Sequence, residues 1–312
     1  MPRVAVVGSY GVGLTMRVPR MPVAGETLSG GQFSSGHGGK GSNQAVQAAR
    51  LGAQVDFFTA IGADDLGRGG QALWTEEGVS AAPLICDDAA TMAGIILVEE
   101  SGENRIVIAP GALDRLRPEH LDDFQPALET ADIVVVSLEI PVSAAVEALE
   151  RAHAAGTMTL LNPAPAAALP DTVWPAVDIL TPNATEAAIL LGLDPSAGET
   201  EPAETLAQRL HEQTGATILM TRGGRGVLVC ADGEITSVPA VPATTVVDTT
   251  GAGDSFTGAA AVALAEGADP IAAAEFGARA GAWAVAHHEV IPALPRRADL
   301  DPDPRSSEGD PA

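Results

Sequence analysis

The segment Val246-Val-Asp-Thr-Thr-Gly-Ala-Gly-Asp-Ser-Phe256 decides the fold, because an extended stretch passes through two glycines directly into an Ala-rich helix predicted over 252–265. Gly251 and Gly253 permit a tight turn that exposes successive backbone N–H groups. The dipole of the helix adds positive potential at the same place. We therefore expect an anion hole formed by Gly251, Ala252 and Gly253.

Asp254 lies in the first turn of this predicted helix. Its carboxylate is placed there to accept a proton from an attacking hydroxyl. A helix start that needs only a cap has no use for two glycines with acids on both flanks, Asp248 and Asp254. We predict phosphoryl transfer at this turn, with Asp254 as the general base, and rank simple capping below it.

Outward from this turn, short apolar strands alternate with helices over most of the chain. Strands are predicted at 3–7, 55–60, 133–137, 158–161, 179–180 and 217–221, and further helices at 41–51, 66–77, 143–155, 185–191, 203–214 and 271–286. This alternation predicts an α/β fold with a mostly parallel sheet covered on both faces. Ligands bind at the carboxyl ends of such strands, so the Gly-rich turns after Val7, Thr221 and Val247 are expected to meet there.

Two extended regions depart from the alternation. Strands are predicted at 14–18 and 27–33, and a hairpin joins 91–98 to 105–108. We expect these regions, about 12–36 and 91–109, to form a small second sheet that acts as a lid over a cleft. The predicted domain covers 1–295, and 296–312 is expected to be a disordered tail, because it is rich in Asp, Pro, Ser and Gly.

Composition excludes several classes of function. The 312 residues are 46% hydrophobic and carry a formal net charge of −24, and so acidic a surface repels nucleic acid and anionic membranes. The sequence predicts no signal peptide and no membrane span. Cys86 and Cys230 form no metal-like or redox-like pair, which favours a cytoplasmic protein. Lys40 is the only lysine.

Two other phosphate-binding motifs are excluded by their spacing. Gly8-Ser-Tyr-Gly-Val-Gly13 reverses the order of the dinucleotide motif G-x-G-x-x-G, and no helix is predicted after it. Gly39-Lys40 lacks the Ser or Thr that a P-loop places after its lysine. The phosphate site is therefore assigned to the turn before Asp254.

Six motifs now occur together in one order. They are Gly38-Gly-Lys-Gly-Ser-Asn-Gln-Ala45, Ser137-Leu-Glu139, Asn162-Pro-Ala-Pro165, Thr181-Pro-Asn-Ala-Thr-Glu186, Thr221-Arg-Gly-Gly-Arg-Gly226 and Asp248-Thr-Thr-Gly-Ala-Gly-Asp254. Over 4–295 the chain resembles the ribokinase family of carbohydrate kinases. The resemblance implies a three-layer α/β/α sandwich with a β-sheet lid, and a homodimer formed through that lid.

The resemblance also implies the reaction, which is transfer of the γ-phosphate of ATP to a primary hydroxyl of a small sugar, with Mg²⁺ and K⁺ as cofactors. It implies catalysis by Asp254 with Gly251, Ala252 and Gly253, and sugar contacts from Gly11, Gly13, Gly39, Lys40, Gly41, Ser42, Asn43, Glu139 and Asp254. It implies ATP contacts from Asn183, Glu186, Thr221, Gly223, Gly226 and Gly253, and a monovalent-cation site at Asp248, Thr250 and Glu289.

Simpler interpretations stay open for several of these residues. Asn183 and Glu186 also suit the capping of a helix, and Lys40 also suits a solvated surface cation. The stretch from Thr221 to Gly226 also suits an ordinary turn at the end of a strand.

Two segments depart from the family pattern. Members that phosphorylate ribose usually carry Asn-x-Asp where this chain has Gly11 and Gly13, and a lost carboxylate leaves sugar hydroxyls unpaired at a cost of about 1–3 kcal/mol. The cation loop usually has glycine and then serine where this chain has Glu289 and Ala293.

Ribose is the default acceptor. One alternative is a nucleoside kinase of the same superfamily, which the aromatic content of 3% disfavours. The other is a catalytically silent sugar-binding protein, which the intact Asp254 disfavours.

Overall fold

The main sheet of the molecule has nine strands, seen in a computed structural model that describes residues 1–99, 101, 103–243 and 245–300. Its order is β15-β14-β13-β12-β11-β10-β1-β4-β6. The strands from β6 to β13 are parallel, whereas β14 and β15 are antiparallel additions. Their bounds are β1 Arg3–Val7, β4 Gln54–Phe58, β6 Ser80–Ala81, β10 Ile133–Ser137, β11 Met158–Asn162, β12 Ile179–Leu180, β13 Thr217–Thr221, β14 Val227–Ala231 and β15 Glu234–Val238.

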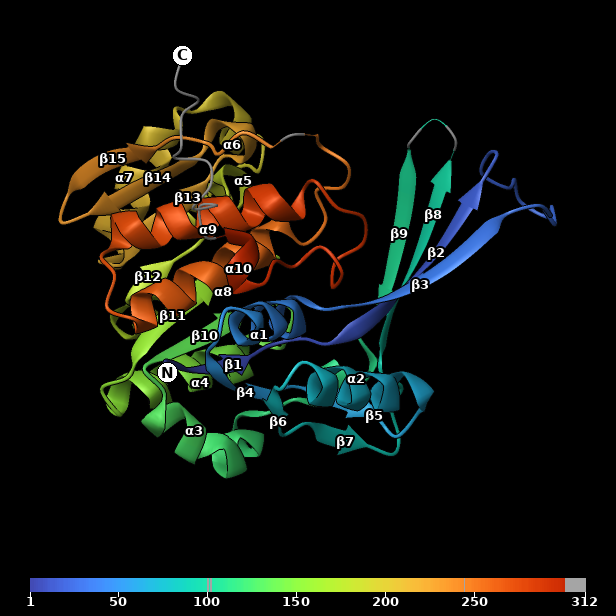
Figure 1. The fold of residues 1–312 in the computed structure, drawn as a ribbon, viewed down its shortest axis with the longest axis horizontal. Coiled ribbons are helices and arrows are strands. Elements are labelled where there is room, and N and C mark those ends of the chain that lie inside the picture. The colour runs from blue at the N-terminus through green and yellow to red at the C-terminus, as the bar shows by residue number, and fades with distance from the viewer. Residues whose placement is uncertain (100, 102, 244, 301–312) are drawn as a thin grey trace, which may run out of the picture.

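Helices cover both faces of this sheet, because successive strand residues point to opposite sides. Val4 and Val6 of β1 pack into one apolar cluster, and Ala5 and Val7 into another. The first cluster is covered by α1 (Lys40–Arg50), α2 (Asp65–Glu76), α8 (Ala252–Ala265) and α9 (Pro270–Ala284). The second is covered by α3 (Gln125–Thr130), α4 (Val142–Ala154), α5 (Ala184–Leu190) and α7 (Ala203–Thr214). The three-layer α/β/α prediction is confirmed, and Figure 1 shows α8 and α9 in front of the sheet.

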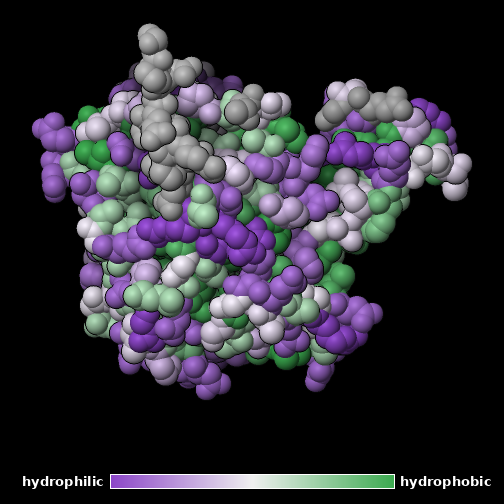
Figure 2. All heavy atoms as spheres, viewed as in Figure 1, coloured by the Kyte–Doolittle hydropathy of each residue, from purple (hydrophilic) through white to green (hydrophobic). Residues whose placement is uncertain are grey.

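A separate four-stranded sheet, which we call the lid sheet, has the order β3-β2-β8-β9. Its strands are β2 (Gly11–Val18), β3 (Gln32–Gly38), β8 (Met92–Glu99) and β9 (Asn104–Ala109). It projects from the body as an arm at the upper right of Figure 1, and the space-filling view shows the same arm in Figure 2. The two extended regions therefore do pair into a second sheet.

One strand of the lid sheet was predicted in the wrong place. Residues 27–31 are irregular, and β3 instead spans Gln32–Gly38. Its glycines have low strand propensity, but antiparallel pairing from Gly11 with Gly38 to Arg17 with Gln32 fixes its position. Pairing with β2, and not the local strand propensity, therefore determines where β3 begins and ends.

The predicted tail also begins too early. Arg297–Leu300 forms the short helix α10, and Leu300 is buried. Arg297 donates to the carbonyl of Leu51 at 3.2 Å and pairs with Glu266 at 2.8 Å. These contacts hold 296–300 on the body although the composition is polar; 301–312 lies outside the described residues.

Smaller elements complete the chain. Next to the edge pair of β4 and β6, a small parallel sheet forms from β5 (Ala60–Gly62) and β7 (Leu84–Cys86). The single strand predicted at 55–60 is therefore two strands, β4 and β5. The remaining helices are η1 (Gly111–Arg115), η2 (Pro118–Phe124), η3 (Asp171–Ala176), α6 (Ala197–Thr200) and η4 (Gly223–Arg225). Across the described part of the chain, every helix is too short or too polar to cross a lipid bilayer.

Candidate active site

The turn before α8 has the conformation that its glycines predict. Gly251 is the residue before the helix and has a left-handed backbone with φ of 79°. A Cβ atom on Gly251 would lie 2.6 Å from Cγ1 of Val290, whereas one on Gly253 would meet nothing within 4 Å. Among the described residues, the backbone N–H groups of Gly251, Gly253 and Asp254 have no acceptor, whereas that of Ala252, predicted for the anion hole, donates to the carbonyl of Thr249 at 3.3 Å. The start of α8 therefore offers three free donors, and the space beside Gly253 is open.

Asp254 is buried in the first turn of α8, with 6% of its surface exposed. Its Oδ2 accepts a hydrogen bond from Asn43 Nδ2 at 2.8 Å, and its Oδ1 accepts one from Gln44 Nε2 at 3.1 Å. Burial raises the pKa of Asp254 above its usual value, while the Lys40 ammonium and the two amides oppose that rise. The result is a positioned carboxylate that is more basic than one in water, as a general base requires.

Lys40 and Glu139 lie beside this carboxylate. Glu139 Oε2 accepts from the backbone N–H of Lys40 at 3.0 Å and from Ser9 Oγ at 2.5 Å. Burial disfavours the charged form of Lys40, but Asp254, Glu139 and Glu186 together raise its pKa. The only lysine is thus half-buried among three carboxylates rather than a solvated surface cation.

Glycines bring the start of α1 against the loop after β1. Gly39 has φ of 90°, and a Cβ on it would lie 2.6 Å from Cα of Tyr10. A Cβ on Gly41 would lie 2.6 Å from Cα of Gly8. This crossing is possible only without side chains, and it places Lys40 and Asn43 next to Glu139 and Asp254.

Asn183 and Glu186 form a reciprocal cap on α5. The Asn183 side chain accepts from the N–H of Glu186, and Glu186 Oε2 accepts from the N–H of Asn183, both at 2.8 Å. The capping interpretation is confirmed. Burial raises the pKa of Glu186, although the Asn183 N–H and Lys40 oppose it. A strand-like bridge pairs Asn183 with Thr221, so two of the predicted ATP-binding segments are adjacent.

The stretch from Thr221 to Gly226 is a closed turn. The N–H of Arg222 donates to the carbonyl of Gly226 at 2.8 Å, and Gly226 has φ of 82°. Gly223 begins the single turn η4 and is exposed.

The residues predicted for a monovalent cation lie in two neighbouring loops. Asp248 Oδ1 accepts from the N–H of Thr250 at 2.9 Å. Glu289 is exposed, with a left-handed φ of 64°, and the adjacent Val290 abuts Gly251. Within the described ranges, no three His, Cys, Asp or Glu side chains are grouped so that they would hold a metal ion. A cation here would depend on backbone carbonyls as much as on carboxylates.

The predicted sugar-contact residues divide between two elements. Gly11 and Gly13 lie on β2 of the lid sheet, whereas Gly39, Lys40, Gly41, Ser42 and Asn43 lie at the start of α1. Ser42 is buried, and its hydroxyl accepts from Trp74 Nε1 at 2.9 Å. Its side chain is therefore committed to the core beside α2.

Sequence reasoning missed three polar residues of the site. Gln44 bonds both Asp254 and Asn162, the latter at 3.1 Å, and Ser9 bonds Glu139. Gln44 and Asn162 both stand inside motifs quoted above, so a search for buried amides in those motifs would have found them. Ser9 carried no signal, because serine after a buried strand is common in turns.

Comparisons with known proteins agree with this geometry. Residues 1–297 match the family model described as pfkB family carbohydrate kinase. The chain is 34% identical over 294 residues to a ribokinase of Haemophilus influenzae, covering 94% of this chain and 95% of that one. It is 35% identical over 304 residues to a ribokinase of Bacillus subtilis, covering 96% and 99%.

Among solved structures, the Arabidopsis thaliana ribokinase complexed with ribose and ATP superimposes with a TM-score of 0.87 at 30% identity. That match covers 96% of this chain and 97% of the plant chain. The six motifs, the three-layer fold with its lid sheet and the buried Asp254 thus occur in a chain that belongs to the pfkB family of carbohydrate kinases.

Proposed function

We propose that this protein is an ATP-dependent sugar kinase that phosphorylates the primary hydroxyl of ribose. The observation that carries the proposal is the buried Asp254 carboxylate, held by Asn43 and Gln44 beside the free N–H groups at the start of α8. The similarity to ribokinases, one of them complexed with ribose and ATP, supports ribose and ATP as the substrates.

In the proposed reaction the primary hydroxyl oxygen attacks the γ-phosphorus of ATP. Its proton passes to the Asp254 carboxylate, and the bond between the γ-phosphorus and the ADP oxygen breaks. The free N–H groups of Gly253 and Asp254 would stabilise the charge on the transferring phosphoryl group. The products are ribose 5-phosphate, ADP and the proton held by Asp254.

The sugar would be held from the α1 side. Asn43 Oδ1 is buried and has no hydrogen-bond partner among the described residues, so it is available to a sugar hydroxyl. Glu139 and Lys40 lie beside it and would bind further hydroxyls. The backbone of Gly39 and Gly41 allows close approach at the same place.

ATP and its metal ion would lie along α5, β13 and η4. We assign ATP contacts to Asn183, Glu186, Thr221, Gly223 and Gly226, in addition to Gly253. Mg²⁺ is usually bound by one or two carboxylates together with phosphates and water, and Glu186 Oε1 has no hydrogen bond among the described residues. Bound Mg²⁺ would neutralise phosphate charge there.

We assign K⁺ to the loops that carry Asp248, Thr250 and Glu289. The left-handed turn at Glu289 and the close contact of Val290 with Gly251 fit a loop that presents carbonyl oxygens next to the anion hole. A cation there would add positive potential to that hole. ATP as the phosphoryl donor also supports the expected cytoplasmic location.

The proposal includes a homodimer formed through the lid sheet. Phe33, Ile95 and Val107 are 63%, 54% and 71% exposed. The strand registers place them on one face of the sheet, opposite the face that carries Gly13. A group of exposed large apolar side chains on an arm that projects into solvent is typical of a protein interface. We propose a second copy of this chain as the partner.

The decisive experiment is product identification. Purified protein, Mg-ATP and D-ribose should give equal amounts of ADP and ribose 5-phosphate, identified by ³¹P NMR, and replacing K⁺ with Na⁺ or omitting Mg²⁺ should lower the rate. Adenosine and other nucleosides form the comparison arm. ATP hydrolysis without a sugar phosphate, or faster turnover of a nucleoside than of ribose, would contradict the proposal.

A further inference from the structure

Three glycines stand side by side across the lid sheet. In the strand registers Gly36 of β3 pairs with Gly13 of β2, and Gly13 pairs with Gly94 of β8. The next row of the same face contains Gly38 and Gly11. These five glycines, which we call the glycine floor, leave one row across three adjacent strands without side chains on one face, and Met92 of β8 completes the second row.

The glycine floor has little hydrogen-bonding capacity of its own. The order β3-β2-β8-β9 makes β2 and β8 internal strands, so their N–H and C=O groups are paired with neighbouring strands on both sides. A Cβ on Gly36 would meet nothing within 4 Å, and one on Gly94 would meet only Ile108 Cγ1, at 3.8 Å. The floor is open at Gly13, Gly36 and Gly94, is covered by the apolar Met92 side chain at Gly11, and has no polar side chain of its own.

Packing on either side shows which way the floor faces. Val12, on the opposite face of β2, packs into the cluster that contains Tyr10 and Trp74. Met92, in the same row as Gly11, packs into the other cluster, which contains Leu138 and Ile140. Gly38 and Gly11 lead directly to Lys40 and Ser9, which both donate hydrogen bonds to Glu139. The glycine floor, on the face turned away from Tyr10 and Trp74, therefore adjoins the proposed sugar site.

Building on the proposed function, we propose that the acceptor site hydrogen-bonds the sugar only from the α1 side. It makes no hydrogen bond to the edge of the sugar that faces the lid sheet. Hydroxyls near Glu139, Lys40 and Asn43 meet polar groups, whereas a hydroxyl over the glycine floor meets none. The acceptor class is therefore pentoses in general, including deoxypentoses that lack the hydroxyl facing the lid sheet.

The expected size of the effect follows from unpaired groups. A site built to hydrogen-bond a hydroxyl rejects the analogue that lacks it by about 10⁴-fold or more, because its own polar groups are left unsatisfied. The glycine floor has no polar side chain that would lose a hydrogen bond when the sugar lacks a hydroxyl. We expect kcat/KM for the better of 2-deoxy-D-ribose and 3-deoxy-D-ribose to lie within about tenfold of that for D-ribose. This is the size of discrimination that a site without hydrogen-bonding groups gives.

Gly13 is the position at which the floor is most readily changed. Its φ is not positive, so an L side chain fits its backbone conformation. A Cβ there would lie 3.5 Å from Ile96 Cδ1, an ordinary van der Waals contact. Gly13→Asp therefore adds a carboxylate without backbone strain, and Gly13→Ala is the matched control that adds only volume. By contrast, a Cβ on Gly11 would lie 2.5 Å from Met92 Cε.

The test measures kcat/KM for the three pentoses with wild type, Gly13→Asp and Gly13→Ala, after thermal unfolding has shown that the variants fold. Support requires weak discrimination by wild type, and preference for ribose increased at least tenfold by Gly13→Asp, mainly through KM, but not by Gly13→Ala. Wild type that accepts ribose and rejects both deoxypentoses by 10³-fold or more would overturn this inference alone. Wild type that accepts no pentose would overturn the proposed function with it. The wild-type comparison decides the question even where a variant does not fold.

Discussion

At the scale of single residues, Asp254 is buried, although its proposed role as general base requires an ionised carboxylate. Replacing it with Asn keeps its shape and removes the base, so we expect kcat to fall by about 10³-fold, within the range that general bases contribute. Steady-state kinetics with ATP and ribose measure the loss. Turnover that stays within a few-fold of wild type would remove Asp254 from the role of base.

The raised pKa of Asp254 also predicts two pH dependences. Its carboxylate must be ionised to act, so kcat/KM should rise with pH through a pKa above the usual value for aspartate. In stability the sign is opposite. A pKa raised on folding means that stability is fully present below the unfolded pKa and is lost as pH rises through the folded pKa.

Asp254→Asn should therefore unfold at the same temperature as wild type in acid and at a higher temperature near pH 8. Thermal unfolding at both pH values measures this difference. A variant that is less stable than wild type near pH 8 would show that hydrogen bonds from Asn43 and Gln44 outweigh the cost of burying the charge.

The base and its glycines were predictable because one short segment contains them. The polar residues that hold the base were harder, since Gln44 reaches Asp254 across 210 positions of sequence. Helical neighbours such as Asn43 and Gln44 usually face different directions. Here both bond Asp254, and both lie near the start of α1, close to that carboxylate.

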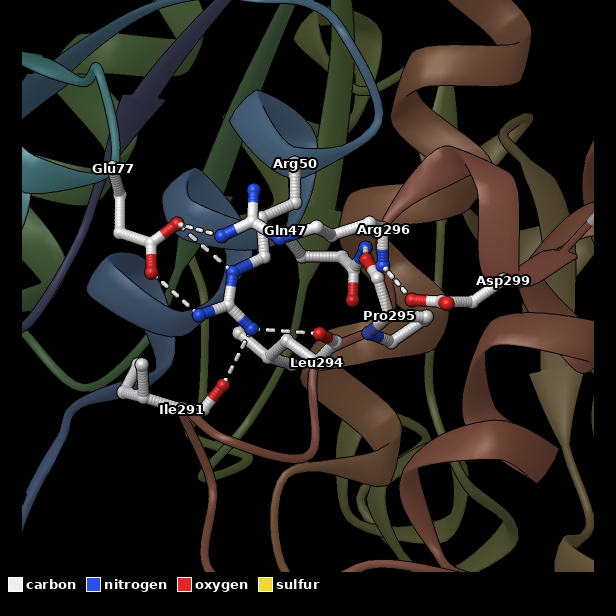
Figure 3. A network of polar contacts seen from close by, with 8 residues as sticks. All are labelled: Gln47, Arg50, Glu77, Ile291, Leu294, Pro295, Arg296 and Asp299. Carbon is white, nitrogen blue, oxygen red and sulfur yellow. Dashed lines mark hydrogen bonds and ion pairs between the residues drawn. The ribbon is translucent and has the colours of Figure 1, made fainter.

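At the scale of elements, α1 binds the 291–295 loop as well as Asp254. Arg50, in its last turn, donates from Nη1 to the carbonyls of Ile291 and Leu294, both at 2.7 Å, and pairs through Nε and Nη2 with Glu77. Gln47 donates to the carbonyl of Pro295 at 3.0 Å and accepts from Ser255, the residue after the base. Figure 3 shows Arg50 between Glu77 and the 291–295 loop.

Arg50→Met should be strongly destabilising. The side chains of Arg50 and Glu77 are only 10% and 8% exposed, so the variant leaves a buried carboxylate whose remaining ion-pair partner, within the described part of the chain, is Arg296 at 3.7 Å. Breaking a buried pair costs about 3 kcal/mol or more. Chemical denaturation of Arg50→Met measures the cost, with Arg68→Met as the matched control, because the Arg68 side chain is 64% exposed and its pair should be worth under about 1 kcal/mol.

The same variant should show a pH dependence. The hydrogen bond from Arg50 lowers the pKa of Glu77, although burial opposes it. A lowered folded pKa contributes stability above the unfolded pKa and loses it as pH falls. The gap between wild type and Arg50→Met should therefore narrow below about pH 4, near the ordinary pKa of glutamate. An equal gap at pH 3 and pH 7 would contradict the ion pair as its source.

The elements that the sequence misplaced share a cause. The strands and helices that were predicted for the body follow local patterns and agree with the structure within one or two residues, apart from the division of 55–60; α3 and β6 were not predicted. β3 and α10 depend on partners far along the chain, β2 for the former and Leu51 and Glu266 for the latter. Local composition does not show either pairing. For this reason the glycines of β3 do not predict a strand, and the charged residues at 296–300 predict a disordered tail.

At the scale of the whole molecule, the lid sheet has two faces with different tasks. One face carries the glycine floor, and the other exposes Phe33, Ile95 and Val107. A net charge of −24 opposes close approach of two copies, so association needs local apolar contact to overcome it. The proposed dimer would bury these side chains and fix the lid sheet beside the sugar site.

Two isoleucines offer a matched test of this division. Ile95 and Ile108 are each 54% exposed, and the register places Ile95 opposite Val107 and Ile108 opposite Gly94, on the two different faces. Ile95→Asp should convert the dimer to monomers, because it puts a carboxylate into the apolar contact, whereas Ile108→Asp should leave the dimer intact and raise KM for the sugar. Sedimentation velocity and sugar-dependent kinetics measure the two effects. Monomers from wild type would overturn the proposed dimer. Dimer loss from Ile108→Asp but not from Ile95→Asp would assign the interface to another surface.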